Sequence, residues 1–178
     1  MKQAINAPVS TSWSECSGPV YANRNGQSYE TNHDLFSGLT VLPGVIERVN
    51  RTVIGHGNLD MILIGNGSLI TIQNMTWNGA QGFSAPPTDD FFVPPHDDYN
   101  LGTLAGSGVF GKTRTERGLT FVEISLSGHM IPQYQPSAAY RTLEFLLGRV
   151  ESLNSTKPFT TSDQGLIAQQ AAISPFKR

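Results

Sequence analysis

Charged side chains are scarce in this chain, and no stretch of it is strongly basic. Of its 178 residues, 12 are Lys or Arg and 14 are Asp or Glu, and the formal net charge is −2 at pH 7. The charged share of 15% falls below the roughly 25% of ordinary soluble domains. Because binding to nucleic acid requires a basic patch for the phosphates, no nucleic-acid partner is expected.

Long apolar runs are also absent. No stretch reaches the roughly 18 residues that span a bilayer, so no membrane partner is expected. The N-terminus lacks the charged and then apolar pattern of a signal segment, which assigns no compartment because an internal or cleaved fragment would lack it too. The length suffices for one domain with a packed core, and 18 Gly with 11 Pro predict many turns.

Cysteine is nearly absent, with Cys16 as the single thiol. A lone Cys is by default a buried or idle thiol, but in a secreted protein it suggests a partner on another chain. Four glycan acceptor sequons favour the secretory route, since glycans would supply the solubility that charges do not. We therefore expect a secreted or vacuolar/lysosomal protein with an interchain disulfide through Cys16. The sequon residues are Asn50, Asn66, Asn74 and Asn154.

Apolar spacing and turn residues predict an α/β chain of short elements. The expected helices are residues 1–8, 42–49 and a stretch beginning at Pro136. The expected strands are residues 52–56, 109–114 and 119–126, of which the last two form a hairpin. The apolar run 61–73 is ambiguous between helix and strand, because periodicity alone does not separate the two there.

Several segments carry expectations about exposure. Residues 80–100, rich in Pro and Asp, are expected to form a long surface loop or lid. The strand 119–126 alternates so that one face is apolar. Residues 1–150 are expected to form the domain, with residues 151–178 as a polar, loosely held extension. A core-facing stripe is predicted on the last helix from Tyr140, Leu143, Leu147 and Val150.

Two short motifs carry chemistry. Gly57-Asn58-Leu59-Asp60 follows one strand, and Ser127-Gly128-His129-Met130-Ile131-Pro132 follows another. Alone, Asp60 is more simply a turn Asp bonded to its own backbone, and His129 a structural His. Together they predict an Asp/His catalytic pair, in which the carboxylate fixes the tautomer of the imidazole and stabilises its charged form. Their order matches the Ser…Asp…His order of α/β-hydrolases.

The nucleophile of such a pair is missing. No Ser before Asp60 lies in the Gly-x-Ser-x-Gly turn that would expose it. Ser84 and Ser107 have partly similar surroundings, but both follow Asp60, so their order is wrong. The sequence therefore predicts part of an enzyme whose nucleophilic Ser lies elsewhere.

These motifs resemble those of the serine carboxypeptidase family, and the His motif, continued by Gln135-Pro136, is quite specific. The segments Lys2-Gln3-Ala4-Ile5-Asn6-Ala7-Pro8 and Trp77-Asn78-Gly79-Ala80-Gln81-Gly82-Phe83 are also similar to that family. The resemblance covers residues 1–150 and is closer to fungal secreted members than to plant ones. It implies the C-terminal part of an α/β-hydrolase fold, with a mixed sheet flanked by helices.

The resemblance implies roles for individual residues. Asp60 would be the orienting carboxylate and His129 the general base and acid of a Ser-Asp-His triad that removes C-terminal residues from peptides. Ile62 and Leu63 match positions that line the pocket for the residue before the scissile bond. Met130 matches a position that lines the pocket for the departing C-terminal residue. No cofactor and no metal are implied.

The resemblance also implies a partner. Cys16 matches a cysteine that family members pair with one nearer their N-terminus. The nucleophilic Ser would then be supplied by a separate N-terminal chain of the same precursor, disulfide-linked through Cys16. Without that chain, a sheet edge and an apolar face would be left exposed.

Three other functions are weighed. An acyltransferase or a hydroxynitrile lyase could use the same scaffold, because a fold alone does not settle the reaction. A non-catalytic fragment or binding module is disfavoured by the retention of both Asp60 and His129. A solvated acidic lid is a simpler interpretation than a metal site for Asp89, Asp90, His96, Asp97 and Asp98. No role is assigned to His33 or His56.

Overall fold

The computed structural model describes residues 3, 9, 10, 12, 37–96 and 106–161. The chain divides into two compact units, Met1–Ser37 and Gly38–Arg178. Apart from Ser37, the first residue of α1, the sheet and helices that follow belong to the second unit. The helix expected at residues 1–8 (of which only Gln3 is described) and Cys16 lie outside the described residues.

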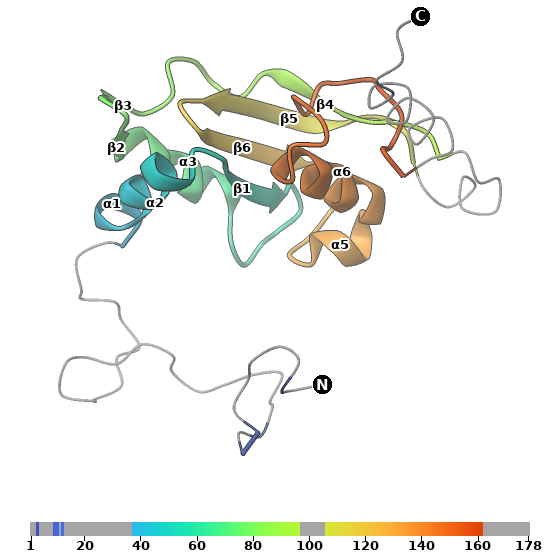
Figure 1. Cartoon of the computed structure of the whole chain (residues 1–178), viewed down its shortest axis with the longest axis horizontal. Helices are drawn as coiled ribbons and strands as arrows, with labels where there is room; N and C mark the ends of the chain where they lie inside the picture. Colours follow the sequence, from blue (N-terminus) through green and yellow to red (C-terminus); the bar gives the residue numbers. More distant parts are fainter. Residues whose placement is uncertain (1–2, 4–8, 11, 13–36, 97–105, 162–178) are drawn as a thin grey trace, which may run out of the picture. The chain divides into compact units, whose positions relative to one another are not determined.

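A four-stranded mixed sheet with the strand order β1-β6-β5-β4 lies at the centre of the second unit (Figure 1). β1 (Thr52–Gly57) runs parallel to β6 (Leu119–Ile124). β5 (Gly108–Glu116) is antiparallel to β6 and also to β4 (Asp89–Val93). The predicted strand 52–56 and the predicted hairpin are confirmed.

The hairpin turns more tightly than predicted. β5 continues to Glu116, so only Arg117 and Gly118 remain between the strands. Both have positive φ, 50° and 84° respectively. Two successive positive φ angles are typical of the two-residue turn whose twist matches that of the flanking strands.

Helices pack on both faces of the sheet. The predicted helix 42–49 is confirmed as α2 (Leu42–Val49). The ambiguous run 61–73 is a loop followed by α3 (Gly65–Asn74), so it is helical in its second part. The predicted helix beginning at Pro136 is confirmed as α6 (Pro136–Leu146). The remaining elements are α1 (Ser37–Thr40), α5 (Ile131–Tyr134) and a small antiparallel sheet of β2 (Thr76–Trp77) and β3 (Ala80–Gln81).

The apolar face predicted for strand 119–126 is confirmed at Val122 and Ile124, which are buried, but β6 is an inner strand and is covered on both faces. Phe121 belongs to a buried cluster with residues of α2 and α3, and Val122 belongs to a second cluster with residues of α6. Leu126 lies beyond the end of β6 at φ 57° and is exposed. The first cluster is Ile46, Ile72, Met75, Trp77, Phe83, Leu119 and Phe121, and the second is Phe91, Val93, Val122, Ile124, Ala138, Phe145, Val150, Leu153 and Phe159.

The prediction of a long surface loop over residues 80–100 is wrong where the structure has strands, at β3 and β4. β4 lies within it, and Phe91 and Val93 on that strand are 0% exposed. Asp90 on the same strand is exposed and lies 2.6 Å from the Lys112 ammonium on β5. The Pro and Asp content therefore concealed a strand with an apolar inner side. Residues 97–100 lie outside the described part.

The predicted core stripe is confirmed for Val150, which is buried in the second cluster, and for Tyr140, which packs against it, but it is wrong for the other two residues. Leu143 and Leu147 are 45% and 58% exposed, whereas Arg141 and Glu144 are fully buried. The Arg141 guanidinium donates to Glu144 at 2.8 Å and to the carbonyl oxygens of residues 155 and 157, both at 2.9 Å. Polar side chains can occupy the inner face of α6 because they are paired there.

Residues 151–161 differ from the loosely held extension that was expected. Leu153 and Phe159 are buried in the second cluster, and Thr160 donates its N–H and hydroxyl to the Glu144 carboxylate. This segment follows the surface of α6 and is fixed by apolar and polar contacts alike. Residues 162–178 lie outside the described part. Within the described residues, every helix is too short or too polar to cross a membrane.

Candidate active site

The two motifs meet because the strands that carry them are parallel neighbours. Gly57 at the end of β1 is paired with Ile124 at the end of β6, so the following loops begin at the same edge of the sheet. The Asn58 N–H donates to the carbonyl of Ile124, and the Leu59 N–H to that of Ser127, both at 2.9 Å. These bonds hold the two loops against each other.

Gly57 permits this close approach. A Cβ at this position would lie 2.3 Å from the carbonyl oxygen of Ser127 and 2.4 Å from that of Gly128. Any side chain would therefore push the loop before His129 away from β1. Gly57 sets the distance between the two motifs.

Asp60 and His129 form a hydrogen-bonded pair. The His129 Nδ1–H donates to Asp60 Oδ2 at 2.9 Å, a direction set by the carboxylate, which only accepts. Asp60 Oδ1 accepts from the N–H groups of Ile62 and Leu63 at 2.8 and 3.0 Å. The Asp60 side chain is 4% exposed and the His129 side chain 50%. A shielded carboxylate thus orients an imidazole that reaches solvent.

The surroundings of Asp60 keep it ionised. Its pKa is lowered from 3.8 to about 2, first by the hydrogen bond from the Leu63 N–H and then by that from His129, while burial acts in the opposite direction. Because hydrogen bonds to the charged form favour that form, the carboxylate remains an acceptor at acidic pH.

A second polar pair, which sequence reasoning missed, lies behind the Asp60 loop. His56 on β1 is buried, and its Nε2 lies 2.8 Å from Ser68 Oγ on α3. Its Nδ1 lies 3.1 Å from the carbonyl oxygen of Leu63. The sequence signal for this pair was the position of His56, near the end of a predicted strand and four residues before Asp60. A pocket of about 360 Å³ is lined by His56, Ile62, Leu63, Ile64, Gly67 and Ser68.

The residues expected to contact substrate flank the Asp60–His129 pair. Ile62 and Leu63 lie in the loop directly after Asp60 and line the pocket described above. Met130 follows His129, precedes α5, and is not among the residues that line this pocket. All three side chains are exposed apolar groups. Their roles in substrate binding stay predictions.

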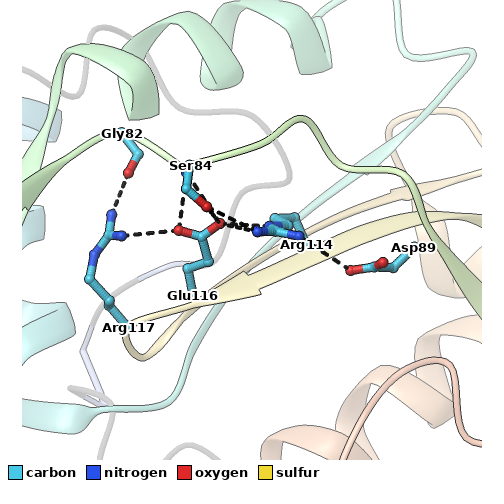
Figure 2. Close-up of polar contacts among 6 residues, drawn as sticks. All are labelled: Gly82, Ser84, Asp89, Arg114, Glu116 and Arg117. Atoms are coloured by element: carbon cyan, nitrogen blue, oxygen red, sulfur yellow. Dashed lines mark hydrogen bonds and ion pairs between the residues drawn. The ribbon is translucent and has the colours of Figure 1, made fainter.

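Ser84 lies at the end of the sheet opposite to the Asp60–His129 pair, in a network with Glu116 (Figure 2). Its hydroxyl donates to Glu116 at 2.7 Å and accepts from Arg114 at 3.1 Å. The Arg117 guanidinium donates to Glu116 and Gly82 and lies 4.4 Å above the Trp77 ring. This network ties the turn after β5 to the segment before β4.

Ser84 is poorly placed for nucleophilic chemistry. Burial raises the pKa of Glu116, but the Ser84 hydrogen bonds and then Arg114 outweigh burial and lower that pKa from 4.5 to about 2. Such a carboxylate is a weak base for a serine hydroxyl, because a useful general base titrates near the working pH.

The acidic residues weighed as metal ligands have other partners. Asp90 pairs with Lys112, and Asp89 lies 3.9 Å from Arg114. His96 lies 2.8 Å from the Ser137 hydroxyl. Among the described residues, no three His, Cys, Asp or Glu side chains gather into a metal site. Asp97 and Asp98 lie outside them, as does His33.

The four sequon residues lie at exposed positions. Asn50 follows α2 in the left-handed region, Asn66 and Asn74 lie on α3, and Asn154 lies in the segment after α6. The Asn74 side-chain amide donates to the carbonyl oxygen of Ile70. Exposure permits glycosylation, which stays a prediction.

The sequence of the chain is similar to those of known serine carboxypeptidases. A sequence model described as serine carboxypeptidase matches residues 1–148. A probable serine carboxypeptidase of Arthroderma benhamiae is 52% identical over 155 residues, which are 86% of this chain and 28% of that protein. Serine-type carboxypeptidase F of Aspergillus niger is 42% identical over 163 residues, 86% of this chain and 30% of that protein.

Among solved structures, a prohormone-processing carboxypeptidase of Saccharomyces cerevisiae matches 64% of this chain and 23% of its own, with 27% identity and a TM-score of 0.46. The chain spans less than a third of the length of the curated relatives named above. The predicted fold class, an α/β-hydrolase type with a mixed sheet and flanking helices, is confirmed. On the family match over residues 1–148 and these identities, the chain belongs to the serine carboxypeptidase family.

Proposed function

We propose that this chain is part of a serine-type carboxypeptidase that removes C-terminal residues from peptides. The observation that carries the proposal is the 2.9 Å hydrogen bond between His129 Nδ1 and Asp60 Oδ2. In this role Asp60 orients the imidazole and His129 transfers the proton, while the nucleophilic Ser comes from a separate N-terminal chain of the same precursor.

The geometry supports this chemistry. With Nδ1 donating to Asp60, the neutral ring of His129 presents Nε2 as a proton acceptor. Within the described part of the chain, no side chain hydrogen-bonds to that nitrogen, and half of the His129 side chain is exposed. A Ser hydroxyl from the second chain can therefore approach Nε2.

The proposed reaction has two stages. The Ser oxygen attacks the last peptide carbonyl while Nε2 of His129 takes its proton, and the imidazolium then protonates the departing amine. Water then attacks the acyl-enzyme in the same way, with His129 taking its proton, and the shortened peptide leaves with a new carboxyl group while the Ser hydroxyl is restored. The ionised Asp60 stabilises the charged imidazole in both stages. Ile62, Leu63 and Met130 supply apolar surface to the side chains on either side of the cleaved bond.

The sheet supports the proposed second chain. β1 is the terminal strand of the order β1-β6-β5-β4, so its free side has no strand partner among the described residues. It also carries the loop with Asp60, near several exposed apolar side chains. A second chain that adds a strand beside β1 would cover this edge. The proposal includes a disulfide from Cys16 to that chain, N-linked glycans on the sequons and a secretory-pathway location.

Two measurements test the proposal. Intact mass with and without reductant, followed by N-terminal sequencing of any released chain, should reveal a disulfide-linked chain with a Gly-x-Ser-x-Gly turn. The purified protein should release the C-terminal residue of a peptide, and Asp60→Asn or His129→Ala should abolish that release. Asp90→Asn, an exposed Asp on β4, is the matched control and should keep full activity.

Opposite results would overturn the proposal. A chain that exists alone with Cys16 as a free thiol, and that releases no C-terminal residue, would be a non-catalytic fragment. If a linked second chain is found and the protein transfers acyl groups to an alcohol but cleaves no peptide, the catalytic pair stands and the protein is an acyltransferase in place of a carboxypeptidase.

A further inference from the structure

His56 is a buried imidazole for which the proposed chemistry has no use. It is 8% exposed and lies on β1, with its ring against Phe121 of β6 at 5.8 Å between centroids. Gly65 at the start of α3 lies so close that a Cβ there would be 3.3 Å from the His56 Cβ. The ring is therefore enclosed by β1, β6 and the beginning of α3.

Both ring nitrogens have a partner. A backbone carbonyl only accepts hydrogen bonds, so Nδ1, 3.1 Å from the Leu63 oxygen, carries the hydrogen. In the neutral ring Nε2 then accepts, and the Ser68 hydroxyl at 2.8 Å donates to it. The Leu63 carbonyl thus fixes the tautomer of His56, and the Ser68 hydroxyl satisfies Nε2 and holds the ring in place.

Leu63 joins this pair to the catalytic loop. Its carbonyl accepts from His56, and its own N–H donates to Asp60 Oδ1 at 3.0 Å. Asp60 in turn accepts from His129 through Oδ2 at 2.9 Å. Hydrogen bonds on both sides of the Leu63 backbone therefore connect Ser68 and His56 to Asp60 and His129.

We propose that His56 and Ser68 are positioning residues for the catalytic pair, which hold the Leu63 backbone where it orients the Asp60 carboxylate. This inference rests on the proposed function for its catalytic consequence. The loop needs such an anchor because Met61, Ile62, Leu63 and Ile64 all have exposed side chains. Those side chains supply little packing to fix the loop, so hydrogen bonds to its backbone do so.

The first readout follows Asp60 directly and does not depend on peptide cleavage. Because the Leu63 N–H is the leading cause of the low pKa of Asp60, displacement of Leu63 should raise that pKa from about 2 towards 3.8. Carboxyl-carbon NMR of the purified protein as it exists, labelled at Asp, reports this value. Glu123, the partner of His56 in the β1–β6 register, and His129, which is bonded to Asp60, are the other ionisable side chains that face this network.

Matched variants separate positioning from general damage. His56→Leu removes both hydrogen bonds, whereas His56→Asn keeps an N–H donor in the place of Nδ1. Ser68→Ala removes the hydroxyl and also the Asn66 sequon, so Asn66→Gln, which removes only the sequon, is its control. Ser68→Thr keeps both the hydroxyl and the sequon. We expect a raised Asp60 pKa in His56→Leu, a smaller rise in Ser68→Ala, and near wild-type values in His56→Asn and Ser68→Thr. If His56→Leu does not fold, the two Ser68 variants decide the result.

The second readout is turnover of a C-terminal peptide substrate. Misplacement of a catalytic group by about 1 Å costs up to about 10²-fold in rate, so kcat should fall about 10- to 100-fold in His56→Leu. Wild-type titration of Asp60 in both His56→Leu and Ser68→Ala would overturn the inference. Wild-type turnover in folded His56→Leu would also overturn it. If the Asp60 pKa rises in these variants but the wild-type protein itself cleaves no peptide, the positioning role of His56 and Ser68 is upheld and the proposed function is rejected.

Discussion

The carboxylate of Asp60 and the imidazole of His129 lie 2.9 Å apart, although the two residues are 69 positions apart in the chain. β1 and β6 bring them together, because parallel neighbours end at the same edge of a sheet and each strand is followed at once by its loop. The shielded carboxylate and the half-exposed ring have the division of roles that an Asp/His pair requires.

Asp60→Asn should leave the fold intact and remove nearly all turnover. An Asn can keep an acceptor for the N–H groups of Ile62 and Leu63, but its NH₂ group then faces His129 Nδ1. The ring would adopt the other tautomer and its Nε2 would no longer accept a proton. We expect a loss of about 10⁴-fold in kcat. Steady-state kinetics on a C-terminal peptide measures it, and a loss below tenfold would contradict the role of Asp60.

Glu116→Gln should make the free energy of unfolding depend less on pH in acidic solution. The folded pKa of Glu116 is about 2 against an ordinary 4.5, so its contribution is present above pH 4.5 and is lost as the pH falls towards 2. The variant should be less stable than wild type at pH 6, and the two should converge near pH 2. Urea unfolding at a series of pH values measures the difference. A difference that stays constant over this range would refute the expectation.

The buried pair Arg141–Glu144 should be sensitive to the loss of one partner. Arg141→Met leaves the Glu144 carboxylate with its Thr160 bonds but without a cation, at a cost of about 3–5 kcal/mol in the free energy of unfolding. The double variant Arg141→Met/Glu144→Leu should recover part of that loss, because no buried charge remains. Chemical denaturation measures both, and a double variant less stable than Arg141→Met would contradict this account.

Local patterns were sufficient for some elements and misleading for others. The strand 52–56 and the helix 42–49 were predicted because their apolar spacing and turn residues agree. β4 was missed because Pro and Asp surround Phe91 and Val93, and only pairing with β5 shows that one side is buried. The predicted stripe failed at Leu143 and Leu147, because the paired Arg141 and Glu144 occupy the buried side of α6, and a sequence pattern does not reveal that pairing.

The site was predictable to a similar extent. Asp60 and His129 could be chosen because each follows a strand, and the structure brings them together. The contribution of His56 depends on the carbonyl of Leu63 and the hydroxyl of Ser68. A backbone atom has no signature in a sequence, so this connection became visible only with the loop in place.

Gly57→Ala should separate the two motifs while the sheet persists. The new Cβ would meet the backbone oxygens of Ser127 and Gly128 at 2.3 and 2.4 Å, so the loop that carries His129 must shift. Such a shift lengthens the bond to Asp60, and we expect kcat to fall by about 10²-fold. Gly44→Ala is the matched control, because a Cβ at that position on α2 meets nothing within 4 Å. Alanine is favoured over glycine inside a helix by about 1 kcal/mol, so the control should be at least as stable as wild type and fully active. Kinetics and thermal unfolding of both variants decide the matter, and equal activity of the two would show that contact between the loops does not control the catalytic pair.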